Sequence, residues 1–271
     1  MKLATFNING INKRLPNLLA WLATSKPDIV CLQELKATDR QFPASALADA
    51  GYGAAWVGEP NWNGVAILAR NLEPIVTQTS LPGDAADGQA RYIEAAVDGT
   101  IIACLYAPNG NPQPGPKFTY KLAWQSRFNA HAQELLDSGL PVIIAGDFNV
   151  VPEPRDIYVT TSYKDNALIQ PKPRAAYADL LAQGWIDTLR HTHPDETIYT
   201  FWDYRRQRWE RNAGLRIDHI LIPPSMRTRL KGTGIDRDVR GKDNASDHAP
   251  VWVELGRPQA DAAPRAKRSS R

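Results

Sequence analysis

The sequence predicts an α/β fold in which mixed sheets pack as a sandwich, and three observations lead to this prediction. Eight short apolar runs have the composition of strands, enough for two sheets. Three segments carry apolar residues at helical spacing and interrupt these runs. Strands and helices do not alternate strictly, because hairpin-length gaps separate several strands, and this disfavours a doubly wound fold.

The predicted strands are short apolar runs, several of them rich in β-branched residues. They cover residues 3–6, 29–32, 65–68, 92–97, 101–106, 142–148, 217–222 and 251–255. The run 142–148 follows Pro141 and is apolar without alternation as far as Ala145, which is typical of a strand buried on both faces.

The helices are predicted from a repeat of about 3.6 residues. Leu15, Leu18, Leu19 and Leu22 share one face of the first helix. The second runs over 118–136 and the third over 174–183, where Gly184 ends it. Two long loops are expected at 108–116, which holds four prolines, and at 152–174. Long loops inside a compact domain are often functional.

Length and composition indicate one domain over residues 1–255, followed by a basic tail, 256–271, that we expect to be disordered. The two cysteines, Cys31 and Cys104, lie in apolar runs and are expected to be reduced, buried thiols. The chain has no apolar segment after Met1 and no run near the roughly 20 apolar residues that a membrane span needs. We therefore expect a cytoplasmic protein without a membrane contact.

Charge is segregated along the chain. The net charge is +3, of which the tail supplies +4, so the body carries about −1. Within the body, Arg205 to Lys242 holds eleven basic and four acidic residues, or +7, which leaves −8 for the rest. A basic segment in an otherwise acidic body fits a polyanion-binding face around acidic metal ligands. A solvated basic surface without a partner is the alternative.

Polar residues gather where the predicted strands end. Asp147 and Asn149 follow the buried strand at 142–148, and two residues apart they point to the same side. The other polar residues near strand ends are Asn7, Glu34, Tyr106, Asn109, Asp218, Asp247 and His248. Each alone has an ordinary structural explanation. Together they offer oxygen ligands to a hard divalent cation, and no Cys/His set has zinc spacing, so Mg²⁺ is the expected metal.

Eight stretches, taken in order, resemble the exonuclease III family of AP endonucleases, within the endonuclease/exonuclease/phosphatase superfamily. They are Thr5-Phe6-Asn7-Ile8-Asn9-Gly10, Cys31-Leu32-Gln33-Glu34-Leu35-Lys36, Asn63-Gly64-Val65-Ala66, Tyr106-Ala107-Pro108-Asn109-Gly110, Gly146-Asp147-Phe148-Asn149, Tyr199-Thr200-Phe201-Trp202, Leu215-Arg216-Ile217-Asp218 and Ser246-Asp247-His248-Ala249-Pro250. The resemblance spans Met1 to about Leu255 and leaves the tail outside.

The resemblance implies a four-layered α-β-β-α sandwich with the site at one edge of the two sheets. The metal ligands it implies are Glu34 above all, with Asn7, Asp147, Asn149, Asp247 and His248. Mn²⁺ would substitute for Mg²⁺. The catalytic residues it implies are Tyr106, Asp147, Asn149, Asp218 and His248, with His248 polarised by Asp218. The general base stays open among Asp147, Tyr106 and His248.

The resemblance also implies that the substrate is double-stranded DNA with abasic sites or recessed 3′ ends. It further implies that the enzyme acts as a monomer. The expected substrate contacts are Asn109, Phe201, Trp202, Asn212, Leu215 and Arg216. An apolar pocket too small for a base would accept a flipped abasic sugar. The expected activities are incision 5′ to abasic sites, 3′-to-5′ exonuclease and removal of 3′-blocking groups in base excision repair.

Some residues depart from the family pattern. Leu35 stands where members often carry Thr, and Asn9 where some carry Asp, which would weaken metal binding. Bulky Leu168 or Tyr163 in the loop 152–174 would restrict the pocket and favour exonuclease over endonuclease work. Two alternatives remain at this point: a phosphoesterase acting on a non-nucleic substrate, and a DNA-binding module without activity.

Overall fold

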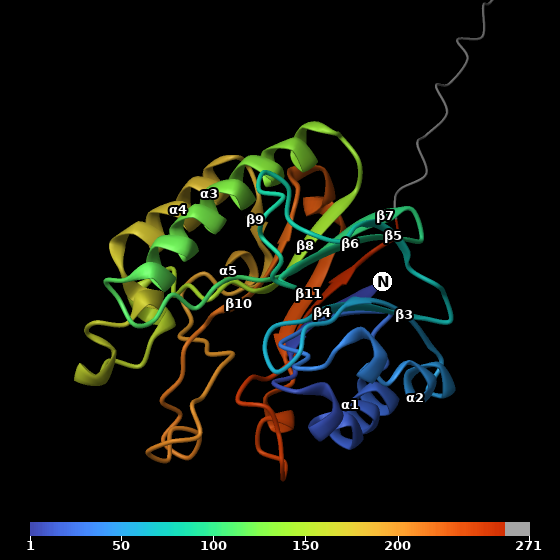
Figure 1. Ribbon diagram of the computed structural model, residues 1–271, viewed down its shortest axis with the longest axis horizontal. Helices are drawn as coiled ribbons and strands as arrows, with labels where there is room; N and C mark the ends of the chain where they lie inside the picture. Colours follow the sequence, from blue (N-terminus) through green and yellow to red (C-terminus); the bar gives the residue numbers. More distant parts are fainter. Residues whose placement is uncertain (258–271) are drawn as a thin grey trace, which may run out of the picture.

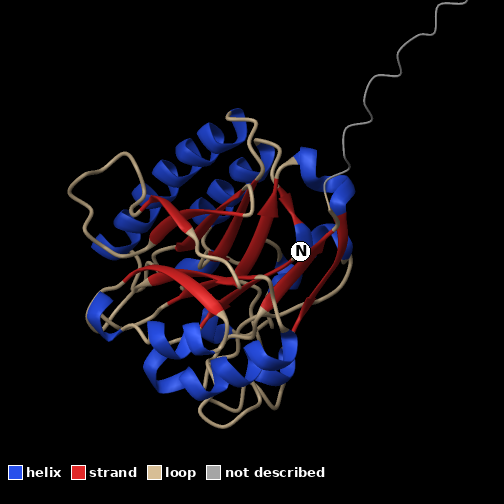
Figure 2. Cartoon of the chain, turned by 90° about the vertical axis from the view of Figure 1, so that its right-hand side faces the viewer, coloured by secondary structure: helices blue, strands red, loops and turns tan. Residues whose placement is uncertain are grey.

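The structure is a computed structural model that describes residues 1–257, and it contains two six-stranded sheets packed face to face (Figure 1). Helices cover both outer faces, so the order of layers is α-β-β-α, as Figure 2 shows from the side. The four-layered prediction is confirmed. The predicted disordered tail lies, beyond Arg257, outside the described residues.

The first sheet contains β1 (Lys2–Asn7), β2 (Ile29–Gln33), β3 (Tyr52–Val57), β4 (Val65–Arg70), β11 (Leu230–Ile235) and β12 (Val251–Leu255). Its strand order is β11-β12-β1-β2-β4-β3. Strands β1 and β2 run parallel, and helix α1 (Ile11–Ser25) connects them. The other neighbours are antiparallel.

The second sheet contains β5 (Ile75–Gln78), β6 (Tyr92–Val97), β7 (Thr100–Tyr106), β8 (Val142–Asp147), β9 (Ile186–Asp187) and β10 (Asp218–Ile222). Its strand order is β5-β6-β7-β8-β10-β9. Strands β7 and β8 run parallel and are joined by helix α3 (Pro116–Asp137), because a parallel pair needs a long crossover. The mixed character of both sheets agrees with the prediction.

The remaining helices are α2 (Ala44–Asp49), α4 (Pro171–Ala182) and α5 (Thr188–Thr192). Short 3₁₀ turns occupy Asp39–Gln41, Pro154–Asp156, Thr161–Tyr163, Ala167–Ile169, Pro224–Arg229 and Arg237–Val239. Helices α1 and α2 cover the first sheet, while α3 and α4 cover the second (Figure 1). None of the helices within residues 1–257 has the length and apolar character required to span a membrane.

The main core lies between the sheets and is built from alternate residues of the facing strands. Ile29, Cys31 and Ile67 of the first sheet meet Ile102 and Cys104 of the second within one buried cluster. Both cysteines are buried and free, as predicted. Packing of both faces explains why β2 and β8 have no exposed residue.

All eight predicted strands and all three predicted helices are present. Edge strands such as β3 and β11 were not predicted, because Gly53, Gly232 and Gly234 weaken the strand pattern of these segments. Helix α4 begins at Pro171 rather than Arg174, since proline fits the first helical position. The loop expected over 152–174 therefore ends at Gln170 and contains three 3₁₀ turns.

The two parallel pairs direct their carboxyl ends to one edge of the sandwich. In the first sheet Asn7 is paired with Gln33, and in the second Tyr106 is paired with Asp147. Asp218 opens β10 directly opposite Asp147 in the antiparallel pair. The topology therefore assembles polar residues from distant parts of the sequence.

Candidate active site

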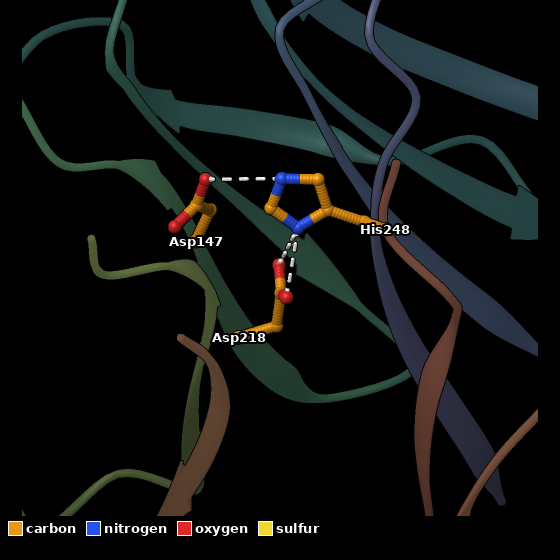
Figure 3. Close-up of side chains that lie close together, drawn as sticks. All are labelled: Asp147, Asp218 and His248. Atoms are coloured by element: carbon orange, nitrogen blue, oxygen red, sulfur yellow. Dashed lines mark hydrogen bonds and ion pairs between the residues drawn. The ribbon is translucent and has the colours of Figure 1, made fainter. Parts of the chain in front are cut away.

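Three buried side chains converge at this edge: Asp147 at the end of β8, Asp218 at the start of β10 and His248 in the loop before β12 (Figure 3). One donor atom from each lies within 4.8 Å of the others. Among residues 1–257, this is the one group of three or more His, Cys, Asp or Glu side chains whose possible metal-ligand atoms lie this close together. The imidazole stands between the two carboxylates.

The His248 ring is held from one side and faces Asp147 with the other. Its Nδ1 lies 2.9 Å from Oδ2 and 3.1 Å from Oδ1 of Asp218, and its Nε2 lies 3.8 Å from Oδ2 of Asp147. The hydroxyl of Thr200 donates to Asp218 Oδ2 at 2.6 Å and fixes that carboxylate. Burial opposes charging of the imidazole, but the carboxylates of Asp218 and Asp147 outweigh it and raise the pKa of His248 to about 10. The ring is therefore an imidazolium at neutral pH.

Asp147 is oriented by two donors. Its Oδ1 accepts from the Asn149 backbone N–H at 2.8 Å, and its Oδ2 accepts from the Asn7 side-chain amide at 3.0 Å. Burial, with the nearby Asp218 carboxylate, raises the pKa of Asp147 to about 7. A carboxyl group with such a pKa can accept a proton from water near neutral pH.

Glu34 follows β2 in the left-handed backbone region, with φ at 56°. Its Oε2 accepts from the same Asn7 amide at 3.0 Å, and its Oε1 lies 2.8 Å from Nζ of Lys36. Asn7 thus donates to the carboxylates of both Glu34 and Asp147. Two carboxylates from different sheets are held side by side by one amide.

Asp247 joins this group through Asn9. The Asn9 amide donates to Asp247 Oδ1 at 2.8 Å, while the Asn9 Oδ1 accepts from Lys36 at 2.6 Å. The hydroxyl of Ser246 donates to the Asn7 carbonyl at 2.6 Å and ties the loop before β12 to the end of β1.

The oxygen donors at this edge fit a hard divalent cation. The carboxylates of Glu34, Asp147 and Asp247 are hard ligands, and no thiolate faces them. Asn7 turns its NH2 group to two of these carboxylates, and its Oδ1, the atom that would ligate a metal, accepts from the Asn9 N–H. His248 fits the role of metal ligand less well, because an imidazolium has no free lone pair. The Asp218 and His248 pair is better suited to bind an anionic oxygen. The arrangement can hold a metal ion beside the His248 imidazole.

Tyr106 stands beside the carboxylates at the end of β7. The guanidinium of Arg91 lies 5.0 Å from the centroid of its ring. Burial, then the charges of Glu34 and Asp147, raises the pKa of Tyr106 well above its usual value. The phenol therefore keeps its proton at neutral pH and acts as a hydrogen-bond donor.

Asn109 and Asn149 are bonded to each other. The Asn109 amide donates to Asn149 Oδ1 at 3.0 Å, and the Asn149 amide donates to the carbonyl of Ala107 at 2.9 Å. The side-chain oxygen of Asn149 is thereby engaged. Asn149 links the loop after β7 to the loop after β8.

The predicted substrate contacts divide into two groups. The half-buried ring of Phe201 lies 4.9 Å from the His248 ring, and Asn109 and Asn212 are exposed near the site or on the adjoining loop. Trp202, Leu215 and Arg216 are each 1% exposed. Their burial favours a role in supporting the site from behind, and their direct contact with the substrate stays a prediction.

Arg216 belongs to a buried ionic network. Its Nε and Nη2 bond both oxygens of Asp156 at 2.7 and 2.9 Å, and its Nη1 lies 2.6 Å from Oδ2 of Asp187. Arg190 also bonds Asp156, at 2.5 Å. The network holds the turn at Pro154–Asp156 against the segment that leads to Asp218.

The contacts of several residues near the site were not predicted from the sequence. Lys36 and Thr200 lie inside the quoted motifs but received no role, and Asn9 was considered only as a departure from the family pattern. A hydroxyl beside a buried carboxylate leaves no signal in the sequence. Only the pairing of distant segments reveals Thr200 under Asp218.

Comparison with known proteins defines the class first. A family model described as Endonuclease/Exonuclease/phosphatase family matches residues 4–248, and the chain belongs to this family. Exodeoxyribonuclease III of Haemophilus influenzae is 33% identical over 268 residues, covering 94% of this chain and all of that protein. The chain therefore falls in the exonuclease III branch, which confirms the family that its motifs indicated.

Two solved structures are similar throughout. A 3′ phosphatase, NExo, from Neisseria, bound to a product DNA hairpin, has a TM-score of 0.91 and 36% identity, covering 95% of this chain and 100% of that chain. An AP endonuclease from Archaeoglobus fulgidus has a TM-score of 0.89 and 36% identity, covering 94% of this chain and 99% of that chain. The fold is shared with enzymes of both kinds.

Proposed function

We propose that the protein is a DNA repair nuclease that hydrolyses phosphodiester bonds with Mg²⁺, for which Mn²⁺ substitutes. The observation that carries this proposal is the buried His248 imidazole, bonded to Asp218 and facing Asp147, beside the oxygen-rich group of Glu34, Asn7 and Asp147. An acceptor carboxylate, a fixed cation and metal ligands within one site supply what phosphoester hydrolysis needs.

Each side chain has a role in this reaction. Asp147 orients the attacking water and takes its proton, because the Asn149 N–H and the Asn7 amide hold its carboxylate in place beside His248. His248 binds a nonbridging phosphate oxygen and stabilises its growing charge, and Asp218 holds the ring in place. The Tyr106 hydroxyl donates to the phosphate. Asn149 keeps the Asp147 carboxylate oriented through its backbone N–H.

Glu34, Asn7, Asp147 and Asp247 are the residues that would hold the metal. When bound, the ion neutralises phosphate charge and helps the leaving oxygen depart. Lys36 bonds Glu34 and Asn9 and so limits the movement of the ligands before the ion binds.

DNA as the substrate is supported by charge and by the relatives. The segment from Arg205 to Lys242 carries +7, and its loop exposes Arg205, Arg206 and Arg211. The ends of this loop are fixed at the site, because Phe201 bridges both Leu215 and His248. Exposed arginines beside a phosphodiesterase centre suit contact with duplex phosphates. A small-molecule phosphatase has no need for them.

Two residues of the loop before α4 bear on the choice of substrate. Leu168 and Tyr163 are buried and pack with Leu215, Ile217 and Phe201 in one apolar cluster. Because the Phe201 ring also lies against His248, we infer that this cluster restricts entry of a flipped abasic sugar. This favours a second candidate function, namely an enzyme that acts mainly on 3′ ends, as exonuclease or 3′ phosphatase, with weak incision at abasic sites.

The proposal is tested with three substrates incubated with Mg²⁺ or with chelator. They are a duplex with one abasic analogue, an undamaged duplex with recessed 3′ ends, and a duplex ending in a 3′ phosphate. We expect metal-dependent cleavage of the two end substrates and slower incision of the first. Cleavage of none, or cleavage that survives chelation, contradicts the proposal. Hydrolysis of only small phosphate esters would support the non-nucleic alternative.

The second candidate is tested with Leu168→Ala. Removing the isobutyl group opens the apolar cluster, and we expect abasic incision to rise by about tenfold relative to 3′ nucleotide removal, the scale of pocket discrimination. The matched control is Leu181→Ala on α4, which packs outside this cluster. An unchanged ratio in Leu168→Ala contradicts steric closure of the pocket.

A further inference from the structure

Lys121 is a buried lysine that the proposed reaction leaves without a role. It lies on α3, in the second turn of the helix, and its side chain has no exposed area. Burial lowers the pKa of Lys121 to about 7, while the Asp147 carboxylate opposes that shift. An ammonium group in the interior weakens a fold unless acceptors compensate for its lost hydration.

The acceptors of Lys121 are two backbone carbonyls of the active-site loops. Its Nζ donates to the carbonyl of Pro108 at 2.9 Å and to that of Asn149 at 2.6 Å. Pro108 lies between Tyr106 and Asn109, and Asn149 lies two residues after Asp147. One side chain thus bonds the loop that follows Tyr106 at the end of β7 and the loop that follows Asp147 at the end of β8.

The backbone of the loop after β8 is shaped so that the carbonyl of Asn149 points to Lys121. Asn149 is in the left-handed region, with φ at 48°, and asparagine tolerates that conformation. Its N–H bonds Asp147 while its carbonyl turns to Lys121. A shift of the Lys121 contact would therefore move the donor that orients the Asp147 carboxylate.

The stem of Lys121 passes against Gly110. A Cβ added at Gly110 would lie 2.6 Å from Cδ of Lys121, and Gly110 has φ at 87°. The loop after β7 is thus shaped around the lysine. Ala107 adds further links, because its N–H donates to the Asp147 carbonyl and its own carbonyl accepts from Asn149.

We infer that Lys121 is a positioning residue that sets the relative placement of Tyr106 and Asp147 by bonding the main chain of both loops from behind. It touches no substrate and binds no metal. The inference rests on the proposed function, because it assigns Lys121 a part in the geometry of that reaction. A displacement of catalytic groups by about 1 Å can lower a rate by about 10²-fold.

The test compares Lys121→Met, which keeps the stem and removes the donor, with Ala132→Gly as matched control. Ala132 is a buried residue three turns further along α3, so its change weakens the same helix without touching the loops. We expect Lys121→Met to lose about 10²-fold in kcat on the recessed 3′ end while KM and DNA affinity change little. Ala132→Gly should keep its kcat at a temperature where both variants are folded.

Hydrogen–deuterium exchange supplies a readout that does not depend on activity. We expect faster exchange in Lys121→Met over residues 107–111 and 148–151, with no rise in α1 or β1. A folded Lys121→Met with parental kcat, equal losses in both variants, or unchanged exchange in the two loops would overturn the inference. If the parent protein cleaves no DNA, the proposed function fails, and the exchange result still decides the role of Lys121.

Gly110→Ala decides the matter if Lys121→Met does not fold. The added methyl group must displace the lysine stem, so we expect a similar fall in kcat at constant KM. Parental kcat in this variant would overturn the inference.

Discussion

The Nδ1 atom of His248 lies 2.9 Å from Oδ2 of Asp218, although the two residues are 30 positions apart in the chain. The bond fixes the orientation of the ring, so that Nε2 faces Asp147 at 3.8 Å. Asp218 is itself held by Thr200. Thr200, Asp218 and His248 are thus linked in series, and the linkage orients the positively charged imidazole toward the proposed phosphate site.

Replacing Asp147 by Asn should lower the rate of DNA hydrolysis by about 10²–10⁴-fold, the usual contribution of a general acid or base. The shape of the side chain is kept, so the affinity for DNA should hold. Single-turnover cleavage of a recessed 3′ end measures the rate. The control is Asp179→Asn, an exposed carboxylate on α4. A rate within about tenfold of the parent would argue against a central role for Asp147.

Replacing Glu34 by Gln should raise the Mg²⁺ concentration needed for half-maximal activity, because one anionic ligand becomes neutral. Activity is measured against Mg²⁺ and against Mn²⁺, after removal of metal by a chelator. Glu254→Gln serves as control, because Glu254 is exposed on β12. An unchanged metal dependence in Glu34→Gln would place the ion elsewhere.

Replacing Arg216 by Met should lower the free energy of unfolding by about 3–5 kcal/mol, because the carboxylates of Asp156 and Asp187 lose their buried partner. Urea denaturation gives the change. The exposed Arg211→Met should leave stability nearly unchanged and weaken DNA binding. If Arg216→Met kept full stability and lost DNA affinity, the result would instead support the direct contact with DNA that the family resemblance implied.

His131 gives a pH dependence of stability away from the active site. Its Nε2 lies 2.5 Å from Oε1 of Glu94, and this hydrogen bond raises the pKa of His131 in spite of its partial burial. A raised pKa in the folded state means that the contribution to stability is complete below the unfolded value of about 6.5 and is lost as pH rises through the folded pKa.

The variant His131→Gln should therefore lose more stability at pH 5.5–6 than at pH 9, a window set by that titration. Urea unfolding at the two pH values measures the difference, and the exposed His191→Gln is the control. Equal losses at both pH values would show that the imidazolium contributes nothing through Glu94.

The sequence was sufficient for the parts of the fold that have strong local patterns. The buried strand β8 was predicted from residues 142–148 because a strand covered on both faces has a continuous apolar run. The edge strand β11 was not, since two glycines and partial exposure remove that pattern. Helix α4 was predicted, but its predicted start lies three residues after the actual one, because the prolines of its first turn are not typical helix residues.

The residues near the site were identified from their types and their order, yet their contacts were not. Asp147, Glu34 and His248 stand in motifs that can be read one by one. The amide of Asn7 bonds both Glu34 and Asp147. This contact exists only because the two sheets meet at one edge. Arg216 was assigned to the substrate by the family resemblance of its segment, and the fold buries its guanidinium against Asp156 and Asp187.

The sequence by itself determined the kinds of group available: carboxylates, a histidine and amides placed where strands end. The tertiary structure decided which of them share a site, which nitrogen of His248 faces Asp147 and which apolar side chains pack beside them. The physical reason is that hydrophobic periodicity is local, whereas hydrogen bonds, buried charge and cavity shape depend on segments far apart in the chain. Lys121 illustrates the difference, because it reads as an ordinary helix residue until the fold places it beneath two active-site loops.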